Sequence, residues 1–313
     1  NHIKLREELE NNSESPNWRG TSDTETLIAL IDVYGLTKTL DKLIGMFALA
    51  LWDKKNNSLY LARDRIGEKP LYFGKQGNFT FFSSELKSIK AHPSFIPHIS
   101  RDATSNFIKY NYIPQPLSIY EDIKKLPPGH FINLTRASTP EAYWQFPFSK
   151  RGSSVNCEKS NEEKTIKSLD YRLSNAVNGQ IQADVSVGAF LSGGVDSSLI
   201  ASKMQELSDK PINTFSVGFE NKQFDEAPYA KKVAKHLGTD HSEYYVENSD
   251  VLSLVTRLPS IFDEPFSDSS QIPTLFISEK AKKAVTVSLS GDGGDELFGG
   301  YNRYNLPKNT WTY

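Results

Sequence analysis

The residues best suited to chemistry lie in two glycine-rich segments of the C-terminal half. The first, residues 191–198, reads Leu-Ser-Gly-Gly-Val-Asp-Ser-Ser and stands between a predicted strand and a predicted helix. Gly193 and Gly194 let the backbone approach an anion without an intervening Cβ. The start of the helix offers unpaired N–H groups and the positive end of its dipole, and Ser192 and Ser197 add hydroxyl donors. Because no Gly-Lys-Ser/Thr ending follows, the segment predicts a phosphate loop other than a Walker A loop.

The second segment, Ser290 to Tyr301, follows another predicted strand and holds five glycines and three carboxylates. Such a glycine excess is costly to order, so packing alone does not explain it. Carboxylates beside phosphates need a cation between them, and Mg²⁺ takes one or two protein carboxylates plus phosphate oxygens. We therefore predict that Asp196 and Asp295 are Mg²⁺ ligands. The alternatives without a ligand are a Gly-Gly turn with a capping aspartate and a flexible acidic turn.

The elements around these segments alternate between strand and helix. Strands are predicted at 185–191, 212–219, 241–246 and 284–289, and helices at 197–205, 227–237, 250–261 and 269–283. This alternation predicts a parallel, doubly wound sheet. Ligands of such sheets bind beyond the carboxyl ends of the strands, which is where both glycine-rich segments stand.

The first half has the pattern of antiparallel β-structure with flanking helices. Residues 22–25, Ser-Asp-Thr-Glu, form a capping box, and Gly35 stands where the helix should end. Strands are predicted at 46–52, 59–62 and 79–82. The first is largely apolar, so we expect it to be buried on both faces. We also expect the strand aromatics Trp52, Tyr60 and Phe79 to Phe82 to lie in the core. A second layer should cover the sheet.

The composition is that of an ordinary globular protein of 313 residues, with 38% hydrophobic and 24% charged residues. We predict a first domain over 1–146, a linker over 147–162 and a second domain over 163–313. The net charge of −2 gives no electrostatic case for binding nucleic acid or an anionic membrane. Cys157 is the only cysteine, so an internal disulfide is excluded and a reducing, cytoplasmic setting is favoured. In the polar linker it is interpreted as an inert thiol.

The phosphate loop resembles that of the N-type ATP pyrophosphatases, and the pattern as a whole resembles the asparagine synthetase family. The likeness is carried, in order and spacing, by Val187–Gly194, Thr214–Phe219, Phe224–Glu226, Asp263–Ser270 and Ser290–Tyr304. In that family the loop holds the β- and γ-phosphates of ATP while a carboxylate attacks the α-phosphate and pyrophosphate leaves.

The resemblance also implies roles for individual residues. Leu191, Val217, Ser290 and Gly291 would contact the adenosine and the α-phosphate. Asp292 would occupy the catalytic acidic position that serves formation of β-aspartyl-AMP and the handling of ammonia. Many relatives have glutamate there, and aspartate is one methylene shorter.

The first half resembles the glutaminase domain of the same enzymes, an αββα layer structure of the Ntn type. The likeness is carried by Asn1–Leu9, Asp64–Tyr72 and Phe82–Leu86. It implies that Asp23 binds the α-amino group of glutamine through an ion pair. From the residues alone, stabilisation of the first helical turn is the alternative role of Asp23.

By this likeness the full-length enzyme would convert aspartate, ATP and glutamine to asparagine, AMP, pyrophosphate and glutamate, with ammonia passing internally between the domains. The family likeness leaves room for a homodimer. The nucleophilic N-terminal cysteine, the oxyanion Asn-Gly pair and a C-terminal helical region have no counterpart in the 313 residues, so we expect the middle of a longer protein without glutaminase activity of its own. Two rivals stay open: an amidotransferase that acts on sugar carboxylates or closes β-lactam rings, and a catalytically inactive nucleotide-binding module.

Overall fold

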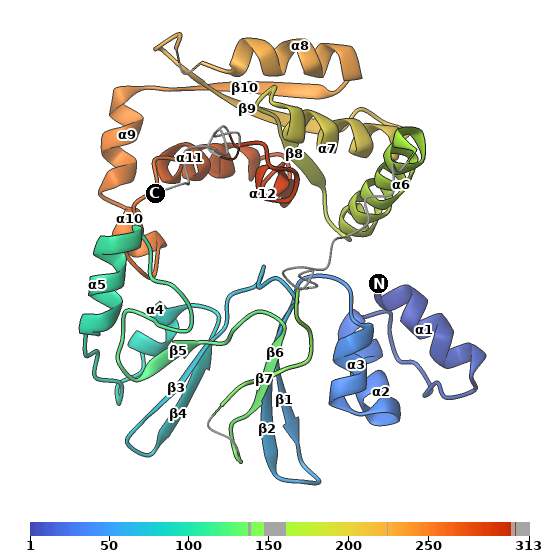
Figure 1. Ribbon diagram of the computed structural model, residues 1–313, viewed down its shortest axis with the longest axis vertical. Coiled ribbons are helices and arrows are strands. Elements are labelled where there is room, and N and C mark those ends of the chain that lie inside the picture. The colour runs from blue at the N-terminus through green and yellow to red at the C-terminus, as the bar shows by residue number, and fades with distance from the viewer. Residues whose placement is uncertain (137–138, 147–160, 224, 302–303, 305–313) are drawn as a thin grey trace. The chain divides into compact units, whose positions relative to one another are not determined.

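A computed structural model describes residues 1–136, 139–146, 161–223, 225–301 and 304 (Figure 1). The chain divides into two compact units. Unit 1 holds Asn1–Val155 together with Pro259–Asp268, and unit 2 holds Asn156–Leu258 together with Ser269–Tyr313. The expected two-domain α/β organisation is confirmed. Most of the predicted linker, residues 147–160 with Cys157, lies outside the described residues.

Unit 1 contains two antiparallel sheets, ordered β1-β2-β6-β7 and β4-β3-β5. Its strands are β1 (Ala48–Asp53), β2 (Ser58–Arg63), β3 (Tyr72–Gln76), β4 (Phe79–Ser83), β5 (Ile123–Lys125), β6 (His130–Asn133) and β7 (Glu141–Ala142). Its helices are α1 (His2–Asn11), α2 (Asp23–Tyr34), α3 (Leu36–Lys42), α4 (Leu86–Lys90) and α5 (Arg101–Tyr110).

The two sheets of unit 1 share one apolar core. Leu61 of β2, Ile132 of β6 and Phe73 of β3 belong to the same buried cluster, so the predicted second layer is present. A second cluster joins Phe81 of β4 to α4 and to Phe95. Helices α1 and α2 pack on each other through a separate cluster that includes Leu5, Leu9, Ala29 and Leu30.

The prediction that the first strand is buried on both faces was wrong. β1 lies at the edge of its sheet and pairs only with β2 within the described chain. One of its faces also meets solvent, and Trp52 is 50% exposed. Phe79 and Phe82 are also exposed, and Phe81 alone of the β4 aromatics is buried. A mostly apolar run therefore did not distinguish an edge strand from a central one.

The turn after β2 is organised by two buried charged residues. Asp64, only 1% exposed, accepts hydrogen bonds of 2.7–2.9 Å from the backbone N–H groups of Gly67, Glu68 and Lys69. Arg63 donates to the carbonyl oxygens of Gly67 and Lys69, and burial lowers its pKa. Each charge thus replaces its lost hydration with backbone dipoles. This accounts physically for the adjacent charged residues Arg63 and Asp64 at the end of β2.

Unit 2 is built on one parallel sheet with the strand order β10-β9-β8-β11. Its strands are β8 (Val187–Phe190), β9 (Asn213–Phe219), β10 (Asp240–Val246) and β11 (Val287–Leu289). Its helices are α6 (Glu162–Ile181), α7 (Val195–Glu206), α8 (Ala227–Leu237), α9 (Asn248–Val255), α11 (Gln271–Ala281) and α12 (Gly294–Phe298). Helix α10 (Leu258–Ile261) begins where the chain passes from unit 2 into unit 1.

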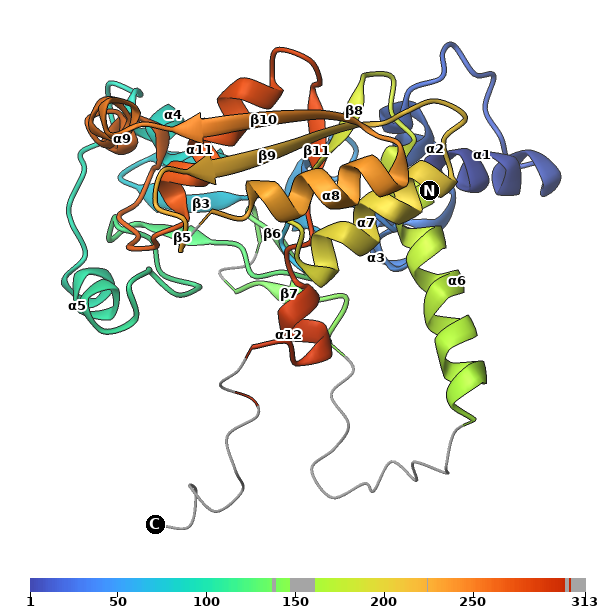
Figure 2. The ribbon, with the colours of Figure 1, turned by 90° about the horizontal axis from the view of Figure 1, so that it is seen from above.

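Helices cover both faces of this sheet, so the predicted doubly wound arrangement is confirmed. One apolar cluster joins α6, α7 and α8 to β8 and β11, and two others join α9 and α11 to β9 and β10 (Figure 2). The strand order reverses at β8: β9 and β10 lie on one side of it and β11 on the other. Helix α8 begins after Asp225, whose carboxylate accepts from the N–H of Ala227, and it ends at left-handed Gly238.

Helix and strand ends differ from the predictions in modest ways. Strands β8 and β11 are shorter than predicted, and the predicted helix over 250–261 is the separate pair α9 and α10. Helix α5, which the sequence analysis did not predict, begins with a Ser100 cap on the N–H of Ala103.

A polar network lies within the α8 side of this sheet. His241 of β10 contacts the hydroxyl of Thr214 at 2.9 Å through Nδ1 and the hydroxyl of Ser216 at 3.2 Å through Nε2. Both hydroxyl residues are buried, and desolvation lowers the pKa of His241. The imidazole is therefore neutral in the folded chain at neutral pH.

Substitution of Asp64 should destabilise unit 1. In Asp64→Ala several buried N–H groups lose their acceptor, so the free energy of unfolding should fall by at least about 3 kcal/mol. Chemical denaturation followed by tryptophan fluorescence measures it, since Trp18, Trp52 and Trp144 all belong to unit 1. Asp32→Ala, at an exposed position of α2, is the control and should change little. Equal loss in both variants would contradict this account.

The stability of the β9–β10 region should fall as the pH drops below about 6.5, the ordinary pKa of histidine. In that range the unfolded chain binds a proton that folded His241 resists, and stability decreases until the lowered folded pKa is passed. Hydrogen exchange of peptides from β9 and β10 at pH 7.5 and 5.5 measures the effect. The His241→Gln variant should lose this part of the pH dependence, whereas His236→Gln, at an exposed position of α8, should retain it.

Candidate functional site

The two glycine-rich segments begin at adjacent points on one edge of the unit 2 sheet. β8 and β11 are parallel neighbours, with Ala189 opposite Leu289. Ser192 and Ser290 therefore follow at the carboxyl ends of neighbouring strands, at the point where the strand order reverses. Ligand sites of doubly wound sheets form at this kind of switch point, because the connections diverge there and leave a crevice.

Hydroxyl groups fix the shape of the first segment. The Ser192 and Ser197 hydroxyls are 2.9 Å apart, and the N–H of Ser192 donates to the Ser197 hydroxyl at 3.2 Å. The N–H of Gly194 donates to the Ser192 hydroxyl at 3.2 Å. Gly194 is the N-cap of α7, so the loop leads directly into the first turn that carries Asp196. The serine hydroxyls of the loop therefore order the backbone that leads into α7, where the N–H groups of the first turn have no partner within the helix.

Gly193 stands where a side chain has no room. Its φ of +83° is left-handed, and a Cβ there would lie 2.7 Å from the backbone nitrogen of Ala230 and from the Cβ of Tyr229 in α8. The first glycine of the pair is thus needed by both the turn and the neighbouring helix, whereas an added Cβ on Gly194 would meet only the Ser192 hydroxyl, at 3.2 Å.

The second segment packs directly on the first. A Cβ on Gly291 would lie 2.6 Å from the backbone nitrogen of Ser197, and one on Gly294 would lie 2.5 Å from the carboxylate carbon of Asp196. Glycine at both positions removes that obstruction. The segments that begin at Ser192 and Ser290 therefore meet at the Asp196 side chain.

The acidic residues of the second segment occupy different positions. The Asp292 carboxylate accepts from the Ser290 hydroxyl at 3.0 Å, before α12 begins. Asp295 lies in the first turn of α12, directly after the glycine that contacts Asp196. Glu296 accepts from the Tyr301 hydroxyl at 2.7 Å. Within the described residues no group of three or more metal-ligating side chains occurs. Ligation of Mg²⁺ by Asp196 and Asp295 stays a prediction.

Val217 lies in the carboxyl-terminal part of β9, two residues beyond Phe215. The carbonyl of Phe215 accepts from the N–H of Leu191 at 2.8 Å, which ties this strand to the start of the first segment. Val217 is half-buried and packs against α11 on the opposite side from α8. The residues expected to contact adenosine, Leu191 and Val217, thus follow one sheet edge with Ser290 and Gly291.

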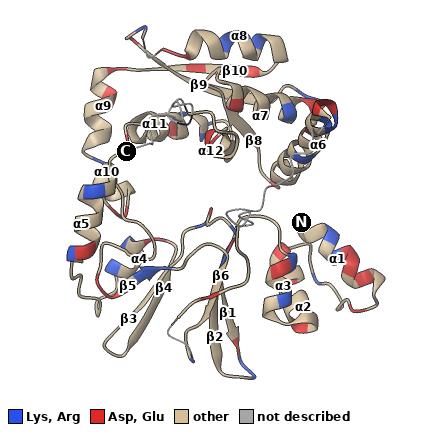
Figure 3. Cartoon of the chain, in the orientation of Figure 1, with Lys and Arg blue, Asp and Glu red and all other residues tan. Residues whose placement is uncertain are grey.

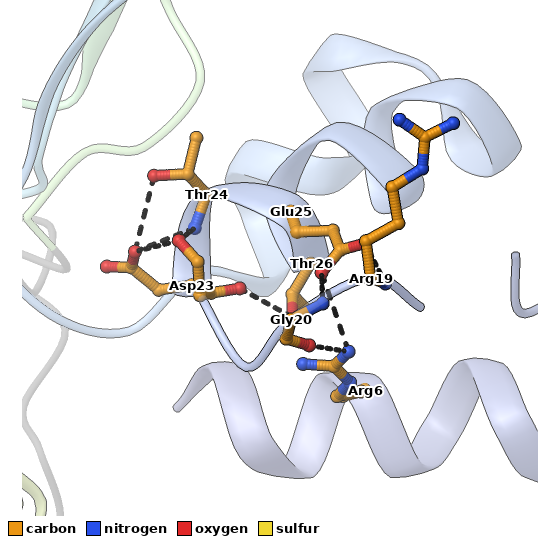
Figure 4. Close-up of polar contacts among 8 residues, drawn as sticks. Arg6, Arg19, Gly20, Asp23, Thr24, Glu25 and Thr26 are labelled. Atoms are coloured by element: carbon orange, nitrogen blue, oxygen red, sulfur yellow. Dashed lines mark hydrogen bonds and ion pairs between the residues drawn. The ribbon is translucent and has the colours of Figure 1, made fainter. Parts of the chain in front are cut away.

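Asp23 lies at the start of α2 in unit 1, and Figure 4 shows its surroundings. Its carboxylate accepts from the backbone N–H of Thr24 at 2.7 Å, and the Ser22 hydroxyl accepts from the same N–H at 3.1 Å. These bonds are those of the helix-start role that the residues alone suggest. One carboxylate can cap the helix and also receive an ammonium group, so the glutamine-binding role stays a prediction.

The loop before Asp23 is held by Glu25, although the predicted reciprocal capping box does not form. The Glu25 carboxylate accepts from the N–H of Arg19 at 2.7 Å and of Gly20 at 3.0 Å. The backbone bond from Arg19 is the main cause of its lowered pKa. Arg6 of α1 donates to the Gly20 carbonyl (Figure 4). The side chain at the third helical position thus reaches back farther than the N-cap, because the loop folds over it.

Charge is mixed on the surface of both units. Basic and acidic residues occur together on α1 and on α6 (Figure 3). No helix in the described part of the chain combines the length and apolar character that crossing a bilayer requires. Asp263–Ser270 contributes to the family likeness, but its residues suggested no functional role from the sequence. Its two adjacent acids beside a proline were the available signal.

Comparisons with known proteins agree with both halves of the structure. The family model described as "Asparagine synthase" matches residues 168–313, and that described as "Glutamine amidotransferase domain" matches residues 1–144. The chain is similar to asparagine synthetase (glutamine-hydrolyzing) 1 of Bacillus subtilis, with 36% identity over 98% of this chain and 47% of that protein. It is also similar to putative asparagine synthetase (glutamine-hydrolyzing) 2 of Methanocaldococcus jannaschii, with 38% identity over 96% of this chain and 57% of that protein. The chain spans about half the length of these relatives.

Gly291→Ala should force the two segments apart. The added methyl group would lie 2.6 Å from a backbone nitrogen that cannot rotate away, so we expect a loss of about 1–3 kcal/mol in the stability of unit 2. Faster hydrogen exchange in residues 192–198 would report it. Gly179→Ala in α6 is the matched control, because nothing lies within 4 Å of its added Cβ. Unchanged exchange in Gly291→Ala would refute the close approach.

Proposed function

Because the chain belongs to the asparagine synthetase family, with a glutamine amidotransferase domain before an asparagine synthase domain, we propose that the complete protein makes asparagine from aspartate, ATP and glutamine. The observation that carries this proposal is the meeting of the two glycine-rich segments at Asp196, on the switch-point edge of a parallel sheet. A nucleotide there would have its phosphates beside the start of α7 and its adenosine along Leu191 and Val217.

The chemistry follows from what this chain places at that edge. A carboxylate is a poor electrophile, and its adenylate gives it a good leaving group. The loop hydroxyls of Ser192 and Ser197 and the N–H groups of the α7 start would orient the β- and γ-phosphates as pyrophosphate separates. Asp292, beside Ser290, would accept the proton that the ammonia nitrogen loses as it attacks the acyl carbon of aspartyl-AMP and AMP leaves.

Two aspartates fit a divalent cation. Asp196 contacts Gly294, the residue before Asp295, and the two aspartates belong to the first turns of α7 and α12. Mg²⁺ prefers such a small carboxylate set and completes its coordination with phosphate oxygens and water. Bound there, Mg²⁺ would neutralise charge that develops on the phosphates.

Unit 1 would supply ammonia from glutamine, with Asp23 as the residue that holds the substrate α-amino group. The ordered loop before α2, fixed by Glu25 and Arg6, supports this role because it limits where that carboxylate can lie. The proposed substrates are small molecules. The proposed oligomeric state is a homodimer. The single cysteine supports a reducing compartment, which for these substrates is the cytoplasm.

Asp196→Asn and Asp295→Asn should each weaken Mg²⁺-dependent ATP binding by at least about tenfold, since each removes one charged ligand. Isothermal titration of the 313-residue chain with ATP, with and without Mg²⁺, measures the loss. Asp209→Asn, exposed beyond the end of α7, serves as the control. Near-normal Mg²⁺ dependence in both site variants would remove the metal assignment.

The acceptor is tested separately in the complete protein. We expect aspartate to support the exchange of pyrophosphate into ATP, and glutamine then to yield asparagine and AMP. Exchange that depends on a sugar carboxylate or on a β-lactam precursor would instead identify a related amidotransferase. Normal ATP binding without exchange for any acid would identify an inactive nucleotide-binding module.

A further inference from the structure

One short segment of the C-terminal half belongs to unit 1. The chain leaves unit 2 after Leu258, contributes Pro259–Asp268 to unit 1, and resumes unit 2 at Ser269. This return lies between β10 and β11 in the chain. A plain linker needs no such contacts, and this segment has several.

Glu264 is bound by unit 1 through both of its carboxylate oxygens. Oε1 accepts from the backbone N–H of Ile119 at 2.9 Å, and Oε2 lies 2.5 Å from Nζ of Lys125. The side chains of Glu264 and Lys125 are 12% and 15% exposed. Removal of either partner would leave a poorly hydrated charge, which is the situation in which an ion pair matters most.

Asp263 is held in a similar way. Its Oδ2 accepts from the backbone N–H of Leu86 at 2.6 Å, at the start of α4, and its Oδ1 is 3.5 Å from Nζ of Lys87. The same lysine donates to the carbonyl of Ile261 at 3.0 Å. The two acids and burial together raise the pKa of Tyr72 in β3, with burial the larger cause. Unit 1 therefore binds the segment at α4 and near β5.

The segment then leads into α11. The N–H of Ser267 donates to the carbonyl of Asn111 at 2.7 Å, and α11 begins at Gln271. Phe276 and Ile277 of α11 are buried in two clusters, and Val217 packs against both. A few residues and one rigid helix thus join the carboxylates bound in unit 1 to the residue proposed to contact adenosine.

We propose that Asp263 and Glu264 are positioning residues that couple nucleotide binding in unit 2 to the order of unit 1. Their carboxylates hold the segment that leads into α11 along the chain, and a nucleotide against Val217 would bear on α11 itself. The proposal rests on the proposed ATP site and goes beyond it: ammonia production and adenylation would be linked through this segment. Such coupling needs an element that both sites bias, and the segment with α11 is that element.

The test is hydrogen exchange of the 313-residue chain with and without Mg²⁺ and ATP. In the unchanged protein ATP should slow exchange in residues 192–198 and also, by about twofold or more, in residues 84–88 and 117–126 of unit 1. Glu264→Gln and Lys125→Met should keep the first effect and lose the second. Lys125→Arg keeps the charge and should retain both. Glu243→Gln breaks an ion pair with Lys231 inside unit 2 and is the control for loss of a carboxylate.

The outcomes separate the two proposals. Slowed exchange at 192–198 with no ATP effect in unit 1 would overturn the coupling and leave the nucleotide site standing. An ATP effect in unit 1 that persists in Glu264→Gln and in Asp263→Asn would also overturn it. Absence of any ATP effect at 192–198 would overturn the nucleotide site and the coupling with it. Exchange measured without ATP identifies any variant that is simply unfolded. Lys125→Met tests the ion pair between Glu264 and Lys125 through the lysine instead of the carboxylate.

Discussion

The structure of unit 2 depends on the close approach of two backbones at the carboxyl edge of β8 and β11. The Asp196 side chain meets Gly294, and the Ser197 nitrogen meets Gly291, at distances that a Cβ could not share. This contact fixes the start of α7 relative to the start of α12. The starts of these two helices therefore adjoin, and backbone N–H groups at a helix start are a favourable environment for an anion.

Unit 1 is ordered by a different use of charge. Arg63 and Asp64 are buried and satisfy backbone carbonyl and N–H groups at a turn, and Glu25 does the same for the loop before α2. Arg63 and Asp64 fix the turn after β2, and Glu25 fixes the loop that precedes Asp23.

The segment Pro259–Asp268 changes how the two units should be regarded. An ordinary linker gives two domains independent stability and independent motion. Here the polypeptide of unit 2 includes a stretch whose polar groups are satisfied in unit 1, including two carboxylates that are largely removed from solvent. The proposed coupling of the two units rests on this stretch of main chain and on α11.

The sequence by itself determined the local features: the glycine pair before a helix, the acid-rich glycine segment after a strand, the helix start at Ser22 and the strand–helix alternation of unit 2. Each follows from backbone geometry or periodicity over a few residues, so each could be predicted. Tertiary structure alone decided that β1 is an edge strand, because burial depends on which strands pair. It also decided that Glu25 holds Arg19 and Gly20, and that Asp263 and Glu264 are bound in unit 1. Those partners lie from 5 to 177 residues away in sequence, and hydrogen bonds and ion pairs at such separations leave no periodic pattern to detect.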